Sequence, residues 1–357
     1  MNRDNKIKQK RKTWRRRLVS LSKIIHQFPR VALRNPKAAI KWLEIGLLKQ
    51  AASPYCYNYP FVLQIEITNH CNLHCRMCPR EREFQAAGIK PSNMPFEVFD
   101  KIMRGWIRHV FQIHLFGRGE PLLTPELPKM IEYSAKHGVP YITFTTNGHL
   151  LRGEVAEALA CSELDELRVS IDGSDEEGYR AIRKLPLQDI KNNLKAFRSM
   201  CDIPISVTTT LCKENWDSVY NMPELAAELG ITCLRLLPVF PYTFFGMDDI
   251  MLTEDKKKDY KNFCRDLGRR CREKGINFIP DHYYVQDCKL PFLMAFIDVK
   301  GNLTPCCKLE TMVTGNVLEE DFFEVWNGPK MINWRKQLLA GRFPKQCKEL
   351  GCIRDWR

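Results

Sequence analysis

The stretch of sequence that decides the fold is residues 66–79, EITNHCNLHCRMCP. It places Cys71, Cys75 and Cys78 at C-x3-C-x2-C spacing directly after an apolar, strand-like run. Thiolate is the ligand that iron-sulfur centres prefer, and a four-iron cluster has four corners to ligate. Three cysteines on one loop therefore predict a cluster with one iron left open for another ligand.

Spacing alone leaves two alternatives open. A zinc site could use His70 or His74 as its fourth ligand, and a ferredoxin-like electron-transfer centre could use a distant cysteine.

Around this loop, apolar runs alternate with helix-like periods from residue 61 to about residue 275, which is typical of βα units around a parallel sheet. The predicted strands are 61–67, 110–116, 141–145, 166–171, 203–209 and 232–237. Polar and glycine-rich segments follow several of these strands, where an α/β barrel carries its chemistry. We predict an α/β fold with an N-terminal extension at 1–57, a barrel domain at 58–275 and a cysteine-bearing module at 276–357.

The net charge of +13 is confined to one end of the chain. The first 50 residues carry 15 basic and 2 acidic side chains, whereas the rest of the chain has 40 of each. A nucleic-acid-binding domain would distribute its basic residues over the folded surface, so we expect no nucleic-acid partner.

The basic extension contains an amphipathic helical pattern, with Trp14, Leu18, Leu21 and Ile25 on one face. This pattern predicts docking on an anionic membrane surface, and packing of the helix on the barrel is the alternative. No apolar run is long enough to span a membrane, and the N-terminus lacks the features of a secretory signal. We therefore expect a cytoplasmic protein, peripheral at the inner membrane surface if the helix docks there.

The loop and the segments after the following strands resemble the radical S-adenosylmethionine (SAM) superfamily over about residues 61–240. The resemblance implies a partial, six-unit (β/α) barrel that resembles a TIM barrel. It also implies a [4Fe-4S] cluster whose open iron chelates SAM. Cys71, Cys75 and Cys78 match the three cluster ligands of the family, and Met77 matches an apolar position near the adenine.

Three further segments match motifs of the same family that bind SAM. Residues 117–121, GRGEP, resemble its Gly-Gly-Glu-Pro segment, although Arg118 interrupts the glycines. Residues 145–148 match a segment that lines the SAM pocket, and Ser170 with Arg183 matches positions that hold the SAM carboxylate. The cofactor-binding residues that the resemblance implies are Met77, Gly117, Gly119, Glu120, Pro121, Thr146, Asn147, Ser170, Asp172 and Arg183.

The C-terminal module contains five cysteines and resembles the SPASM or shortened "twitch" domain of radical SAM enzymes. Since a full SPASM domain uses about seven cysteines, we expect one auxiliary [4Fe-4S] cluster here. The expected ligands are Cys288, Cys306, Cys347 and Cys352, with Cys307 as a substitute for Cys306. A zinc-stabilised subdomain is the alternative.

The resemblance implies that flavodoxin or ferredoxin reduces the first cluster, which cleaves SAM to a 5′-deoxyadenosyl radical that abstracts hydrogen from a substrate carbon. We expect a two-electron oxidation, a dehydrogenation, of a sugar-like, aminocyclitol or lipid-linked small molecule. The alternatives are a peptide or protein maturase and a non-enzymatic iron-sulfur electron carrier. A dehydrogenation needs a base, and the candidates are Asp281, His282, Tyr283 and Asp287.

Overall fold

The computed structural model describes residues 53–357 except 106, 241, 243–245, 281–287, 310–311 and 350–357. The N-terminal amphipathic pattern and its predicted membrane docking lie outside the described residues. Within the described part, none of the helices has the length and apolar composition needed to cross a membrane.

One ten-stranded sheet forms the centre of the described chain, in the order β10-β9-β8-β1-β2-β3-β4-β5-β6-β7. Strands β1 to β7 are parallel to their neighbours, and β8 is parallel to β1 on its other side. Strands β9 and β10 are antiparallel. The strands are β1 Val62–Ile65, β2 Gln112–His114, β3 Tyr141–Thr146, β4 Glu166–Ser170, β5 Ile205–Leu211, β6 Cys233–Pro238, β7 Asn277–Pro280, β8 Met294–Ile297, β9 Asn302–Thr304 and β10 Gly315–Asn316.

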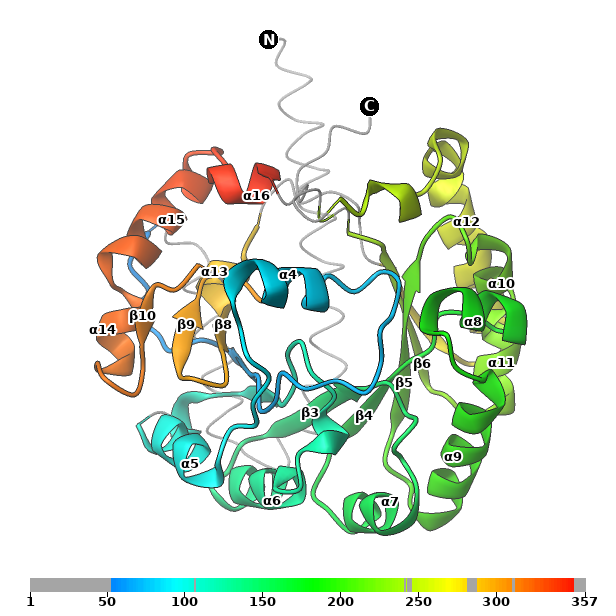
Figure 1. Cartoon of the computed structure of the whole chain (residues 1–357), viewed down its shortest axis with the longest axis horizontal. Coiled ribbons are helices and arrows are strands. Elements are labelled where there is room, and N and C mark those ends of the chain that lie inside the picture. Colours follow the sequence, from blue (N-terminus) through cyan, green and yellow to red (C-terminus); the bar gives the residue numbers. More distant parts are fainter. Residues whose placement is uncertain are drawn as a thin grey trace. The chain divides into compact units, whose positions relative to one another are not determined.

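Helices connect the parallel strands and lie around the outside of the curved sheet, as Figure 1 shows for α5, α6, α7 and α9. The helices are α4 Arg80–Ala87, α5 Phe96–Arg104, α6 Leu127–Lys136, α7 Gly153–Ala160, α8 Glu176–Arg183, α9 Leu187–Met200, α10 Trp216–Tyr220, α11 Met222–Glu228, α12 Glu254–Glu273, α13 Leu290–Leu293, α14 Phe322–Trp326, α15 Pro329–Leu339 and α16 Lys345–Glu349. Short 3-10 turns occur at Ile107–His109, Pro121–Leu123 and Asp248–Ile250. All six predicted strands are present, and the predicted partial α/β barrel is confirmed.

The two faces of the sheet differ sharply in composition. Alternate strand residues on the outer face are aliphatic or aromatic and pack against the helices in one core, as Leu63, Ile113 and Phe144 do. The register pairs Gln64 with His114, His114 with Thr143 and Thr143 with Glu166, so these polar side chains share the inner face. The inner face of a closed TIM barrel is commonly filled with branched apolar side chains. Here it is polar.

The sheet continues into the region that we assigned to the C-terminal module. Strand β7 pairs with β6, and β8 pairs with β1 over four residues. The domain boundary at residue 275 remains a prediction. The backbone hydrogen bonds of β7 to β6 and of β8 to β1 join residues on the two sides of this boundary.

A buried arginine holds the C-terminal helices to the rest of the sheet. The Arg335 side chain on α15 lies 4.2 Å above the ring of Trp326 on α14. Its Nε donates to the carbonyl of Pro291 at 2.8 Å, and its Nη1 donates to Asn327 at 3.2 Å and to the carbonyl of Pro54 at 3.3 Å. Arg335 is fully buried, so these contacts and the ring of Trp326 offset part of the cost of burying its charge, while Nη2 has no hydrogen-bond partner among the described residues.

We expect Arg335→Ala to destabilise the protein by about 3–5 kcal/mol, because it leaves a cavity beside Trp326 and unpaired carbonyl groups. The thermal unfolding midpoint measures this effect. Lys336→Ala, on the exposed side of the same helix, is the matched control and should leave the midpoint nearly unchanged. Equal midpoints for the two variants would contradict the assigned role of Arg335.

Candidate active site

The loop between β1 and α4 carries the three predicted cluster ligands. Burial, together with the charges of Glu120, Cys75 and Cys78, raises the pKa of the Cys71 thiol to about 11. These mutual interactions place the three thiols within electrostatic range of one another. The backbone N–H of Cys78 donates to the Cys75 carbonyl at 3.0 Å, which forms a tight turn between the last two cysteines.

The donor set fits an iron-sulfur cluster better than zinc completed by histidine. His74 is paired with Glu81, and His70 is exposed. The described residues contain no ready-made cage of three or more ligand side chains for a single metal ion. The fit therefore rests on the chemistry of the three thiols that one loop carries, and not on a preformed cage, because thiolate is the ligand that iron-sulfur centres prefer.

The glycines after β2 lie against the cysteine loop itself. A Cβ atom at Gly119 would lie 2.3 Å from the carbonyl oxygen of Thr68 and 2.5 Å from that of His70. The next residue, Glu120, donates its backbone N–H to the same His70 carbonyl at 2.6 Å. A Cβ at Gly117 would lie 2.5 Å from Oε1 of Glu66. Glycine at both positions allows the two loops to approach each other closely.

Glu120 organises the ends of β2 and β3. Its buried carboxylate accepts hydrogen bonds from the Thr146 hydroxyl at 2.6 Å and from the backbone N–H of Asn147 at 2.7 Å. Burial raises the pKa of Glu120, and these hydrogen bonds oppose that rise. Asn147 also donates to Asn72 on the cysteine loop at 2.8 Å. The structure thus brings the GRGEP segment, Thr146 and Asn147 together beside the predicted cluster ligands; Pro121 begins the 3-10 turn that follows Glu120.

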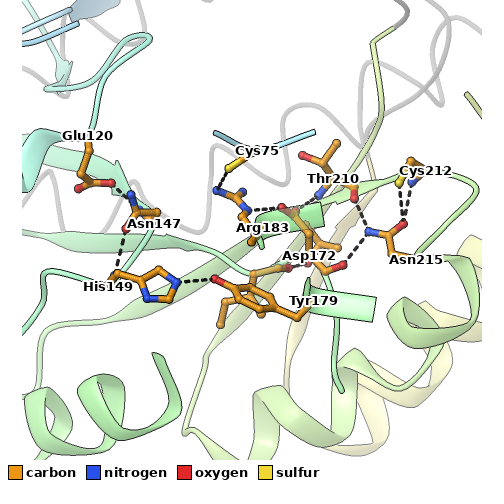
Figure 2. A network of polar contacts seen from close by, with 12 residues as sticks. Cys75, Glu120, Asn147, His149, Asp172, Tyr179, Arg183, Thr210, Cys212 and Asn215 are labelled. Carbon is orange, nitrogen blue, oxygen red and sulfur yellow. Dashed lines mark hydrogen bonds and ion pairs between the residues drawn. The ribbon is translucent and has the colours of Figure 1, made fainter. Parts of the chain in front are cut away.

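Asp172 and Arg183 form a buried ion pair, with Nε of Arg183 2.5 Å from Oδ2 of Asp172 (Figure 2). Asp172 also accepts from the backbone N–H of Thr210 at 2.7 Å. On its other side, Nη1 of Arg183 lies 3.6 Å from Sγ of Cys75. Burial lowers the pKa of Arg183, but the charges of Asp172 and Cys75 outweigh this and raise it. The guanidinium therefore stays charged and faces a predicted cluster ligand.

The remaining predicted SAM residues lie near these groups. Ser170 ends β4, two residues before Asp172, and is half-buried on the inner face. Met77 packs against a small apolar cluster that includes Ile182 and Val239. The structure therefore gathers the predicted cofactor residues at the carboxyl ends of β1 to β4.

Arg118, which interrupts the family motif, has a structural partner. Its Nη2 lies 2.8 Å from Oε2 of Glu83 on α4, and both side chains are nearly buried. Its backbone N–H donates to Oε1 of Glu66 at 2.7 Å. Tyr242 also interacts with Arg118, and Cys78 and Cys307 influence the pKa of its phenol. Sequence reasoning did not identify Glu66, Glu83 or Tyr242, because their partners are distant in sequence.

Two of the predicted auxiliary ligands share one small apolar cluster. Cys347 on α16 is buried with Leu309 and Trp334, and Cys306 packs against the same cluster. A hydrogen bond that the Cys307 thiol donates to Cys306, together with burial, raises the pKa of Cys307 well above its usual value. Adjacent thiols beside a third buried cysteine fit the ligand chemistry of an iron-sulfur cluster.

Five predicted residues lie outside the described part of the chain. They are the ligand Cys352 and the base candidates Asp281, His282, Tyr283 and Asp287. Cys288 directly follows the last of these and is half-buried.

We expect Gly119→Ala to destabilise the protein by about 3 kcal/mol, because the added methyl group overlaps two carbonyl oxygens of the cysteine loop. The displaced loop should also bind less iron after anaerobic reconstitution. Gly105→Ala is the matched control, since its methyl group meets open space and the residue already has helical φ. Normal iron content in Gly119→Ala would show that the close approach is dispensable.

Glu66 predicts a pH dependence. Burial raises its pKa to about 7, against 4.5 ordinarily. Between pH 4.5 and 7 the folded state keeps a proton on Glu66 that the unfolded state has lost. The protonated carboxyl group therefore contributes its full stability to the folded state below pH 4.5, and this contribution is lost as the pH rises through 7. Glu66→Gln removes this pH dependence, because glutamine does not ionise. We expect the stability of the wild type relative to Glu66→Gln to fall by about 3 kcal/mol between pH 4.5 and 8, measured by thermal unfolding. A constant difference would contradict the raised pKa.

Comparison with known proteins identifies the families that two parts of the chain resemble. Residues 65–226 match the model of the radical SAM superfamily, and residues 288–353 match the SPASM model of an iron-sulfur cluster-binding domain. The AdoMet-dependent heme synthase of Methanosarcina barkeri is 24% identical over 77% of this chain and 84% of its own length. The PqqA peptide cyclase of Streptomyces rochei is 28% identical over 77% of each chain.

A solved structure shows the same fold. Streptococcus suis SuiB bound to its precursor peptide SuiA superimposes with a TM-score of 0.67 and 16% identity, covering 90% of this chain and 76% of SuiB. The two family models lie over the two regions in which the predicted cysteine ligands occur. The cofactors that they imply are a [4Fe-4S] cluster, SAM and auxiliary iron-sulfur centres. The chain therefore carries a radical SAM domain, matched over residues 65–226, and a C-terminal SPASM domain, matched over residues 288–353.

Proposed function

We propose that this protein is a radical SAM oxidoreductase that modifies a residue of a peptide substrate. The cluster and SAM, when bound, supply a radical that removes hydrogen from an unactivated carbon. The proposal replaces the small-molecule substrate that we expected from sequence, because the comparisons favour the peptide alternative. One relative is a peptide cyclase, and SuiB has a precursor peptide bound.

The polar inner face of the sheet carries this proposal. Gln64, His114 and Glu166 project from the strands whose carboxyl ends meet the cysteine loop. A barrel interior filled with aliphatic side chains would leave no polar group to bind a substrate. This inner face instead offers donors and acceptors, which suits the amide and polar side-chain groups of a peptide.

The residues of the first site have distinct proposed roles. Cys71, Cys75 and Cys78 hold the cluster, and Arg183 stabilises the negative charge of the Cys75 thiolate. Glu120 fixes the loops after β2 and β3, which orient SAM.

The C-terminal module has a redox role in this proposal. Cys306 and Cys347, with Cys288 and Cys352, would hold an auxiliary cluster, which when bound would supply an acceptor for the second electron of the oxidation. A flavodoxin or ferredoxin supplies the first electron. The base candidates Asp281, His282, Tyr283 and Asp287 precede Cys288 in the sequence, and one of them would accept the released proton.

The test uses the full chain, reconstituted anaerobically with iron and sulfide, together with size-fractionated extract of the source cells. We expect SAM-dependent 5′-deoxyadenosine formation to rise when the peptide fraction is added, and the rise to disappear after proteinase K treatment of that fraction. Formation is measured by chromatography and mass spectrometry.

The Cys71→Ala/Cys75→Ala/Cys78→Ala variant is the control and should form no 5′-deoxyadenosine with any fraction. A rise that survives proteinase K, or one that occurs only with the small-molecule fraction, would refute a peptide substrate. It would favour a metabolite, as the heme synthase relative suggests.

A further inference from the structure

Five ionisable side chains gather on the inner face of the sheet, apart from the predicted cluster and SAM ligands. They are His114 on β2, Tyr141 on β3, Glu166 and Arg168 on β4, and Arg235 on β6. We call them the inner-face cluster.

Glu166 is the only carboxylate of the inner-face cluster, and both arginines use it. Nε of Arg168 lies 2.7 Å from its Oε2, and the Tyr141 hydroxyl donates to the same oxygen at 2.9 Å. Nη2 of Arg235 reaches Oε1 at a longer 3.4 Å. Burial raises the pKa of Glu166, but the two arginines outweigh this and hold it at about 2. Glu166 is thus ionised, and it holds Arg168 at close range but Arg235 only at a longer distance.

The cluster carries one positive charge that no member balances. Burial and the two arginines lower the pKa of His114 well below 6.5, so the imidazole is neutral. Burial and Glu166 raise the pKa of Tyr141, so the phenol is also neutral. Two guanidinium groups therefore face one carboxylate. The Arg168 side chain is 11% exposed and that of Arg235 is 26% exposed, so the excess charge lies in a largely buried site, where a bound anion would balance it.

Several buried polar atoms of this region have no hydrogen-bond partner within the described part of the chain. They are Nε of Arg235, Nε2 of His114 and Oγ1 of Thr143. Thr143 is fully buried and lies between His114 and Glu166 in the register of the sheet. Each unsatisfied buried group costs about 1–3 kcal/mol, so three in one place favour a missing ligand over a purely structural ion pair.

We propose that Arg168 and Arg235 form a carboxylate-binding site for an acidic residue, aspartate or glutamate, of the peptide substrate. This inference rests on the proposed peptide-modifying function and specifies its substrate. A planar carboxylate matches the fork of a guanidinium group. Its single negative charge also balances the single excess charge of the cluster, whereas a phosphate group carries nearly twice that charge at neutral pH.

The position of the site suits a substrate anchor. Arg168 lies two residues before Ser170 on β4, which is about 7 Å deeper along the strand than the predicted SAM residue. Arg235 is level with Ser170 across β5, since both pair with Thr208. An acidic side chain bound there leaves the neighbouring peptide residues at the carboxyl ends of the strands, where the cofactor residues lie.

Saturation-transfer NMR on the reconstituted full chain tests the site without knowledge of the substrate. The probes are N-acetyl-glutamate N-methylamide and the corresponding glutamine compound. We expect the glutamate probe to bind at least tenfold more tightly than the glutamine probe, and Arg235→Gln to abolish this preference. Arg269→Gln, an exposed arginine on α12, is the matched control and should retain it. Equal binding of the two probes, or an unchanged preference in Arg235→Gln, would overturn the proposal.

Glu166→Gln provides a second test that does not depend on the folding of Arg235→Gln. Because Glu166 competes with the ligand for both arginines, its neutral replacement should bind the glutamate probe severalfold more tightly. The probe should also raise the unfolding midpoint of Glu166→Gln more than that of the wild type. A purely structural ion pair predicts no stabilisation by the probe, and that result would refute the site. Probe binding combined with protease-resistant stimulation would instead retain the site and refute the peptide function.

Discussion

The buried ion pair between Asp172 and Arg183 is the interaction on which the active-site end of the barrel depends. It connects the end of β4 to β5 through Thr210, and it connects α8 to the cysteine loop through Cys75. The loop backbone is attached to the same helix, because Arg76 donates its N–H to the carbonyl of Ile182 at 3.1 Å. The loop is thus oriented by charge and hydrogen bonding, and removal of either partner leaves the other charge buried and unpaired.

The contrast between the two faces of the sheet has an energetic basis. The outer face obtains its stability from aliphatic packing against helices, where Leu63, Phe144 and Val207 are fully buried. The inner face contains polar groups whose burial is unfavourable unless they are paired. The packing between the outer face and the helices therefore stabilises the fold, whereas the inner face provides groups for recognition. Substitutions on the inner face can alter substrate choice while the outer core is preserved.

Much of this organisation could be predicted from the sequence. The predicted strands show apolar, strand-like runs, and the first four are followed by chemically unusual segments; both features are local in the sequence. The contacts of Arg118 with Glu83 and Glu66 could not be predicted, because they join residues 35 and 52 positions apart. Strand β8 was missed for the same reason: four apolar residues become a strand only through pairing with β1. The inner-face cluster likewise depends on the register between strands.

The parallel pairing of β8 with β1 limits where the C-terminal module could be exchanged between related enzymes. Residues 294–297 lie within the segment that matches the SPASM model, yet their hydrogen bonds belong to the barrel. The boundary between the two families in sequence is therefore not the boundary between two independent folding units. Exchange of auxiliary modules between relatives has to leave β8 with the barrel, paired in register with β1, which restricts viable junctions to the chain beyond Ile297.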